Sequence, residues 1–130
     1  MNGPFPLASI VAVAAGAALG GVLRWLVSGW LNHRWHGFPL GTLAVNCVGG
    51  LMIGAAMVAF ERWPADTLRL FLVVGVLGGL TTFSAFTGES WGLLQRGEWT
   101  LAAVHTLAHV FGALMCAALG FWLLRTLARG

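Results

Sequence analysis

The sequence predicts an all-α membrane protein with four transmembrane helices, in one membrane domain that covers residues 1–130. Of the 130 residues, 58% are hydrophobic and only 8% are charged, whereas a soluble domain carries about 25% charged residues. A helix needs about 20 apolar residues to cross the hydrocarbon core of a bilayer. Four largely uncharged runs of this kind fill the chain, so there is room for four spans and for almost nothing else.

The first two helices are predicted at about 7–31 and about 40–60, in runs rich in Ala, Val, Leu and Gly. Each run contains two glycines four residues apart, and such pairs favour the close approach of helix backbones in membranes. The pairs are Gly16 with Gly20 and Gly50 with Gly54. We therefore expect both helices to pack through their glycine faces.

The third helix is predicted at about 70–94, and it contains a stretch, GVLGGLTTFSAF, that is poorly suited to a continuous helix. Glycine weakens a helix, and threonine is β-branched and can bond to backbone carbonyls. Irregular backbone at membrane depth is tolerated only where it is buried in protein, lines a wet cavity or binds an ion. We therefore predict a mid-membrane break near 78–82, and a glycine-rich packing face is the alternative.

The fourth helix is predicted at about 99–124, and it places His105 and His109 four residues apart on one face. Such a pair could bind a metal, relay protons, donate hydrogen bonds to an anion or bond to a neighbouring helix. Metal binding is the least favoured of these, because no Cys, Asp or Glu stands at helical spacing beside the two histidines.

The distribution of arginines predicts that the chain can insert in both directions. With four spans, the termini and the second loop share one side of the membrane, with four arginines, and the other two loops share the opposite side, with three. A clear excess of Lys and Arg on one side sets the orientation of a membrane protein, and four against three is almost no excess. If both orientations form, an antiparallel homodimer is the expected product. The alternative is that one arginine decides the topology. The two sets are Arg62, Arg69, Arg125 and Arg129, and Arg24, Arg34 and Arg96.

Several classes of protein are not expected. The chain has no lysine and its arginines are scattered singly, whereas a nucleic-acid footprint is a basic patch. An HExxH motif, a P-loop and a GxSxG elbow are missing from the sequence, so an enzyme is not expected. No basic residue precedes Arg24, which argues against a cleavable signal peptide. Cys47 and Cys116 are expected to be small packing residues rather than a disulfide.

Phe83 and Phe86 are spaced to share a helix face beside Thr82, Ser84 and Thr87. The edge of an aromatic ring is positive, so two ring edges turned inward could hold a small anion. Phenylalanine that faces lipid or the core is the alternative. The neighbouring hydroxyls favour the inward, polar interpretation.

Asn46, Glu89 and Arg24 are the remaining polar candidates. The amide of Asn46 offers two donors to an anion, or an interhelical hydrogen bond as the alternative. Glu89 could end a polar track or pair with an arginine such as Arg24, unless it is a solvated helix end. Arg24 could concentrate anions at a vestibule, although its side chain could also extend to the headgroups.

Together, GTLAVN in the second span, GGLTTFSAF in the third and the early Arg24-Trp25 pair resemble the Fluc/CrcB family of fluoride channels. The resemblance covers about residues 12–125. It implies an antiparallel, dual-topology homodimer with two fluoride pores. A structural sodium ion is also implied, held at the dimer interface by the backbone carbonyls of Gly78 and Thr81.

The resemblance also implies roles for particular side chains. Phe83 and Phe86 match the pore phenylalanines and Asn46 matches the pore asparagine. Members of the polar stretch on the third helix are Thr82, Ser84 and Glu89. The fourth helix departs from the family, because His105, His109 and Ala113 stand where hydroxyl residues are common.

The function implied is passive, fluoride-selective export across a bacterial-type cytoplasmic (inner) membrane, which would lower cytoplasmic fluoride and give fluoride resistance. The expected partners are fluoride, a second copy of the chain and the lipid bilayer, with no organic cofactor. Two rivals stay open. One is a small proton-coupled exporter of the four-span, dual-topology type, although such exporters depend on a carboxylate in the first span and this first span has none. The other is a non-conducting membrane subunit.

Overall fold

A computed structural model describes residues 5–35 and 37–129, and these residues form helices and no strand. The long helices are α1 (Leu7–Leu31), α2 (Leu40–Arg62), α5 (Phe83–Gln95) and α6 (Trp99–Leu127). Between α2 and α5 lie α3 (Asp66–Arg69), the π-helix η1 (Leu70–Leu77) and α4 (Gly78–Leu80). Four segments are long and apolar enough to cross a membrane, namely Leu7–Leu31, Leu40–Arg62, Asp66–Gln95 and Trp99–Leu127. The prediction of an all-helical chain with four candidate spans is confirmed.

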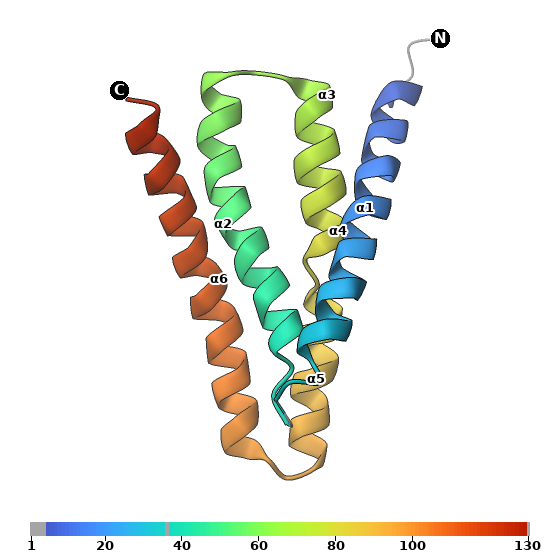
Figure 1. Ribbon diagram of the computed structural model, residues 1–130, viewed down its shortest axis with the longest axis vertical. Coiled ribbons are helices and arrows are strands. Elements are labelled where there is room, and N and C mark those ends of the chain that lie inside the picture. Colours follow the sequence, from blue (N-terminus) through green and yellow to red (C-terminus); the bar gives the residue numbers. More distant parts are fainter. Residues whose placement is uncertain (1–4, 36, 130) are drawn as a thin grey trace.

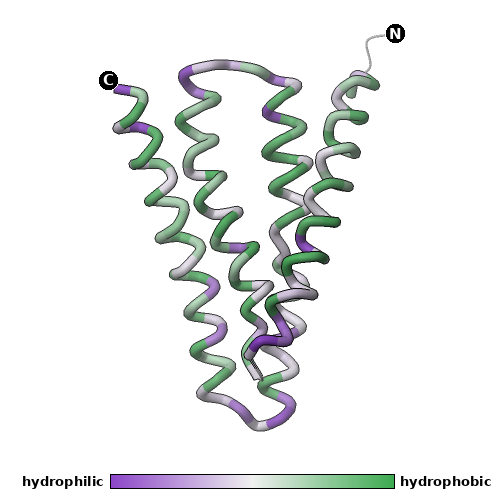
Figure 2. Tube along the Cα trace, viewed as in Figure 1, coloured by the Kyte–Doolittle hydropathy of each residue, from purple (hydrophilic) through white to green (hydrophobic). Residues whose placement is uncertain are grey.

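The helices form an open fan (Figure 1). The α1–α2 and α5–α6 connections lie at its narrow end, while the α2–α3 connection and the two ends of the chain lie at its wide end. Two pairs of helices make most of the contacts, α2 with α6 and α1 with η1 and α4. The apolar colouring of Figure 2 runs along all four segments, and hydrophilic residues gather mainly in the connections.

The pair formed by α1 and the η1–α4 segment is held by glycines. Gly16 and Gly20 are buried on α1, and they lie against the backbone around Gly75 and Val76. A Cβ atom added to Gly16 would lie 2.9 Å from the Cα of Gly75, closer than side chains approach one another. The predicted glycine face of the first helix is confirmed.

The pair formed by α2 and α6 uses the same device. Gly50 and Gly54 are buried on α2, where a Cβ added to Gly54 would lie 2.9 Å from the backbone nitrogen of Phe121. Gly120 of α6 approaches α2 in the same way, and its Cβ would lie 3.2 Å from the nitrogen of Ala55. Small residues let the backbones touch, so dispersion contacts replace the hydrophobic effect that lipid cannot supply.

The third candidate span is not one regular helix. It begins at Asp66, before the predicted start near residue 70, because an acidic residue in the first turn complements the helix dipole. Its first half includes the π-helix η1. This form is rare in proteins, and where it occurs it often lies at a functional site. Gly78 and its two successors are still helical, but Thr81 and Thr82 have extended backbone with ψ of 154° and 121°. The helix resumes as α5.

Candidate functional site

The extended residues between α4 and α5 are held by one side chain of α2. The backbone N–H of Thr82 donates to Asn46 Oδ1 at 2.8 Å, and Asn46 Nδ2 donates to the carbonyl of Thr82 at 3.0 Å. Asn46 therefore replaces the helical partners that Thr82 lacks. One of its two amide hydrogens is used in this contact, and the amide has a second donor. The predicted interhelical bond of Asn46 is present.

The same geometry changes the partners of two carbonyls. In a regular helix the Gly78 carbonyl would accept from the N–H of Thr82, which instead donates to Asn46. The Thr81 carbonyl would accept from the N–H of Ala85, which instead donates to Thr82 Oγ1 at 3.1 Å. Thr82 thus caps the N-terminus of α5, and the carbonyls of Gly78 and Thr81 are released from the helical pattern.

Arg24 approaches this break from α1. Its Nε donates to the carbonyl of Gly79 at 3.0 Å. The suggested pairing of Arg24 with Glu89 is wrong, because Glu89 contacts Thr42 and His105 instead. The reason is that Arg24 faces the end of α4, where the carbonyl of Gly79 accepts a hydrogen bond from its guanidinium group.

Phe83 and Phe86 differ in their surroundings. Phe83 is 79% exposed in the single chain, and its ring lies 5.4 Å from that of Phe86. Phe86 is half-buried and packs on two rings of α6, with its centroid 4.7 Å from His109 and 5.6 Å from His105. Both histidines of α6 therefore pack against an aromatic ring of α5.

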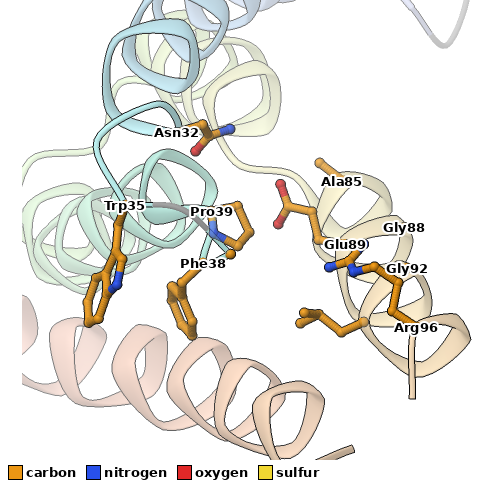
Figure 3. A pocket seen from close by; sticks show the side chains of 11 residues that line it. Asn32, Trp35, Phe38, Pro39, Ala85, Gly88, Glu89, Gly92 and Arg96 are labelled. Atoms are coloured by element: carbon orange, nitrogen blue, oxygen red, sulfur yellow. The ribbon is translucent and has the colours of Figure 1, made fainter. Parts of the chain in front are cut away.

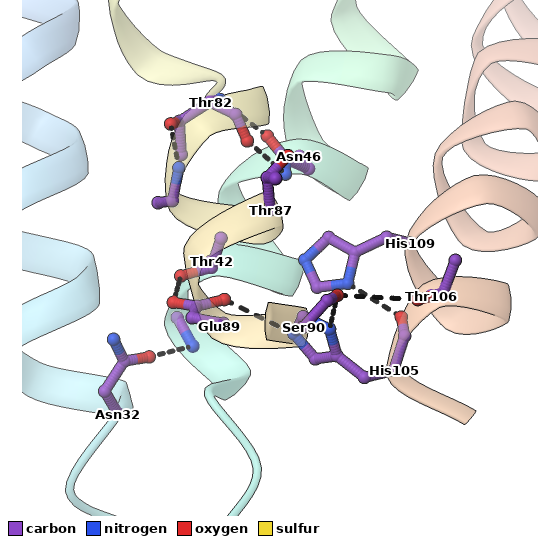
Figure 4. Close-up of polar contacts among 12 residues, drawn as sticks. Asn32, Thr42, Asn46, Thr82, Thr87, Glu89, Ser90, His105, Thr106 and His109 are labelled. Atoms are coloured by element: carbon purple, nitrogen blue, oxygen red, sulfur yellow. Dashed lines mark hydrogen bonds and ion pairs between the residues drawn. The ribbon is translucent and has the colours of Figure 1, made fainter. Parts of the chain in front are cut away.

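A polar cluster lies further along α5 (Figure 4). Glu89 Oε1 accepts a hydrogen bond from Thr42 Oγ1 of α2, and Glu89 Oε2 faces His105 Nε2 at 3.3 Å. On the other side of the His105 ring, Nδ1 lies 2.9 Å from Ser90 Oγ. His109 Nδ1 lies 3.0 Å from the backbone carbonyl of His105. Both histidines are buried.

The contact of His109 fixes the position of its proton. A carbonyl only accepts hydrogen bonds, so His109 Nδ1 must carry the hydrogen. In the neutral ring, Nε2 then presents a lone pair rather than a donor. The suggestion that a neutral histidine here donates an N–H to an anion therefore does not apply to His109 Nε2.

Two pockets lie beside the polar track, the row of side chains from Asn46 and Thr82 past Phe86 to Glu89. A pocket of 480 Å³ at the narrow end is lined by Asn32, Phe38, Glu89 and Arg96, among others, and Figure 3 shows the Glu89 side chain pointing into it. A second pocket, of 450 Å³, is lined mostly by residues from the break, α5 and α6. Its lining is Asn46, Thr81, Thr82, Phe83, Phe86, His109, Val110, Ala113 and Leu114. The cluster of Glu89, His105 and His109 borders both pockets, since Glu89 lines the first and His109 lines the second.

Two members of the site were missed from the sequence, Thr42 and Ser90. Thr42 precedes Asn46 by four residues, so both lie on one face of α2. That spacing was visible in the sequence and could have identified Thr42. Ser90 directly follows Glu89, and only its approach to α6 reveals its contact with His105. Ser84 lies beside Thr82, with 3.3 Å between the two hydroxyls.

Four segments long and apolar enough to cross a membrane, the third of them interrupted beside polar side chains, point to an integral membrane protein. Residues 11–121 match the model of a family described as CrcB-like protein, Camphor Resistance (CrcB). The chain belongs to this family.

Curated relatives extend over nearly the whole chain. A protein of Aromatoleum aromaticum named "Fluoride-specific ion channel FluC" is 47% identical over 117 residues, which cover 88% of this chain and 89% of the relative. A protein of the same name from Marinobacter nauticus is 45% identical over 124 residues, covering 94% and 98% of the two chains. A third, from Chromohalobacter salexigens, is 46% identical over 114 residues, or 86% of each chain.

Proposed function

We propose that the chain is a passive, fluoride-selective channel that exports fluoride and lowers its cytoplasmic concentration. The observation that carries the proposal is the polar track beside the break, from Asn46 and Thr82 past Phe86 to Glu89, in a chain whose relatives carry the name of fluoride channels. Those relatives are named as channels, in agreement with the expectation that the chain is not an enzyme. Export in this manner would give fluoride resistance to a cell that places the protein in its cytoplasmic (inner) membrane.

The track offers what a small anion needs. Fluoride is strongly hydrated, so a pore must replace its water with hydrogen-bond donors. The second amide hydrogen of Asn46, the hydroxyl of Ser84 and the ring edges of Phe83 and Phe86 would supply such donors and positive edges. Several weak sites in sequence suit conduction, because an ion must leave as readily as it enters.

We infer an antiparallel, dual-topology homodimer from the exposed side of this track. Phe83 is 79% exposed in one chain, and Gly78 and Ser84 are exposed beside it. A pore lined on one side only would open to lipid, so a second copy across a two-fold axis would close it. In such a dimer the break of the third helix lies at mid-membrane depth. Expression with reporters fused to the C-terminus, read on both sides of the membrane, tests the dual topology.

A structural sodium ion fits the break. The carbonyls of Gly78 and Thr81 leave the helical pattern, and sodium, a hard cation, prefers oxygen ligands. Two copies related by a two-fold axis would supply both pairs of carbonyls. When bound, the ion would neutralise these carbonyl dipoles at the dimer interface. Dimer stability that depends on sodium but not on bulkier monovalent cations is the expected result.

The deciding experiment is fluoride efflux from liposomes that contain the purified protein, followed with a fluoride electrode. Potassium and valinomycin dissipate the voltage, and chloride efflux is the control. A channel gives fast fluoride loss that requires valinomycin, with chloride retained. Electroneutral loss coupled to protons would instead support the exporter, and no loss from folded protein would support a non-conducting subunit.

Two substitutions locate the pore. Phe86→Ile removes the ring that lies between Phe83 and the histidines, and it should abolish most of the fluoride efflux. Phe83→Ile should act in the same direction. Trp91→Phe is the matched control, because Trp91 is an exposed aromatic residue of the same helix that lines neither pocket. Equal efflux in all three variants would contradict the assignment of the pore.

A further inference from the structure

The cluster of Glu89, His105 and His109 has the composition of a metal site. One carboxylate and two imidazoles reach it from α5 and α6, and their ligand atoms all lie within 4.8 Å of one another. His105 is 0% exposed and His109 is 5% exposed. This set could not be recognised from residue spacing, because Glu89 stands on a different helix from the two histidines.

Three polar atoms at the centre of the cluster make no hydrogen bond, and two of them, Glu89 Oε2 and His105 Nε2, face each other at 3.3 Å. Among the residues that the structure describes, Glu89 Oε2, His105 Nε2 and His109 Nε2 are buried and have no hydrogen-bond partner. Buried polar atoms nearly always have one, so each such atom calls for an explanation. Ligand atoms of the three residues lie within 4.8 Å of one another, so one cation among them could satisfy these groups together.

The other atoms of these side chains are already engaged. His109 Nδ1 donates to the carbonyl of His105, and His105 Nδ1 contacts Ser90 Oγ at 2.9 Å. Glu89 Oε1 accepts from Thr42. Histidines that bind metals usually donate their second N–H to a carbonyl or another acceptor, which orients the ring and fixes its tautomer. The surrounding contacts therefore leave His109 Nε2 free to act as a ligand. His105 Nε2 is free in the same way when the hydrogen of that ring is on Nδ1.

The distance between one pair of these atoms also agrees with a metal of the size of zinc. Zinc binds histidine nitrogen and carboxylate oxygen at about 2.0–2.2 Å, so two ligands at a tetrahedral angle stand about 3.3 Å apart. His105 Nε2 and Glu89 Oε2 are 3.3 Å apart. Imidazole ligands favour zinc and its neighbours over magnesium or calcium, which prefer oxygen.

We propose that Glu89, His105 and His109 bind one zinc-type divalent cation per chain, and that the bound cation blocks the fluoride pathway. Three protein ligands leave one position open for water or an anion. The cation would lie between the two pockets of the track, where it would hold fluoride too tightly for rapid passage. The blocking part rests on the proposed channel function, and the binding part does not.

Metal binding is tested on purified, tag-free protein that has been stripped with a chelator. Co²⁺ is added as a spectroscopic probe, and Zn²⁺ then competes for the site. We expect one equivalent of Co²⁺ per chain, with the intense visible bands of four-coordinate cobalt, and displacement of Co²⁺ by Zn²⁺. Octahedral cobalt spectra, or no saturable binding, would overturn the proposal.

Variants place the site. Glu89→Gln keeps the shape of the side chain and removes its charge, and His109→Ser removes a ligand; each should weaken Zn²⁺ binding by at least about tenfold. His33→Gln is the matched control, since His33 is exposed in the α1–α2 connection, and Cys116→Ala tests the thiols. Full-strength binding by a folded Glu89→Gln or His109→Ser protein would overturn the proposal, as would loss of binding in either control.

Fluoride efflux separates the two claims. Liposomes with metal-free protein should conduct fluoride. If conduction stops at the Zn²⁺ concentrations that displace all Co²⁺ from the site, both metal binding and the block are supported. Conduction without metal binding would overturn this inference and leave the channel function standing. Metal binding in protein that never conducts fluoride would support the metal site and overturn the proposed channel function. Binding that leaves efflux unchanged would overturn the block alone.

Discussion

The glycine contacts and the polar cluster hold neighbouring helices together by different means. Gly54 of α2 and Gly120 of α6 bring the backbones of these two helices close together. In the polar cluster, Thr42 and Glu89 join α2 to α5, and Ser90 and His105 join α5 to α6. Lipid provides no hydrophobic drive for helix association, so close packing stabilises the first set of contacts and hydrogen bonds stabilise the second.

The two kinds of contact leave different groups free. At Gly54 and Gly120 an added Cβ atom meets the backbone of the neighbouring helix. The polar contacts leave donors and lone pairs beside pockets of 480 and 450 Å³. An ion can use such groups, which is why the candidate site belongs to the polar contacts.

The largest effect should come from filling a glycine contact. Gly120→Leu would drive its side chain into the backbone of α2 near Ala55, and overpacking of this kind costs about 3 kcal/mol. The free energy of unfolding in detergent is the measurement. Gly29→Leu is the control, because no atom lies within 4 Å of the Cβ position at Gly29. Equal stability of the two variants would show that the glycine contacts do not hold α2 to α6.

Removal of Asn46 should rank second for stability and first for conduction among the polar residues. Asn46→Leu leaves the N–H and the carbonyl of Thr82 without their partner, at a cost of about 1–3 kcal/mol. Fluoride efflux should fall with it. Thr87→Val is the control, since it removes an exposed bond to the carbonyl of Phe83 and should leave stability almost unchanged. Wild-type stability of Asn46→Leu would mean that the extended backbone at Thr81 and Thr82 does not depend on the hydrogen bonds of Asn46.

A smaller loss of stability is expected at Arg24. Arg24→Met keeps the aliphatic stem and removes the bond to the Gly79 carbonyl, which should cost about 1 kcal/mol. Arg34→Met is the comparison, because Arg34 lies over the ring of Trp30 in an exposed position. If Arg34→Met lost more stability than Arg24→Met, the contact at the end of α4 would contribute little.

The smallest effect on stability should come from Ser90→Ala. Ser90 orients the His105 ring through Nδ1, so its loss should change stability by about 1 kcal/mol or less. It should weaken Zn²⁺ binding by about tenfold, as loss of a group that orients a ligand commonly does. A Ser90→Ala protein with wild-type zinc affinity would show that His105 is oriented by the packing of Phe38 and Phe86 alone.

Composition and periodicity already predicted the all-helical chain, its four candidate spans and the glycine faces of α1 and α2. These follow from local properties: the length of apolar runs and the spacing of small residues on one helix face. The same local rules predicted an irregularity near residues 78–82. They could not place it at Thr81 and Thr82 rather than at the glycines before them. That choice depends on Asn46 of another helix, which offers Thr82 substitutes for its helical partners.

The amino-acid order alone is enough to predict four candidate spans with a polar interruption, because burial in lipid and backbone hydrogen bonding act on each segment separately. Which polar groups meet depends on the packing of the helices. Arg24 bonds to Gly79 rather than to Glu89, and Glu89 meets His105 from another helix. Contacts of this kind depend on how far each helix is rotated and displaced against its neighbours. The glycine contacts fix that arrangement, and no single segment encodes it.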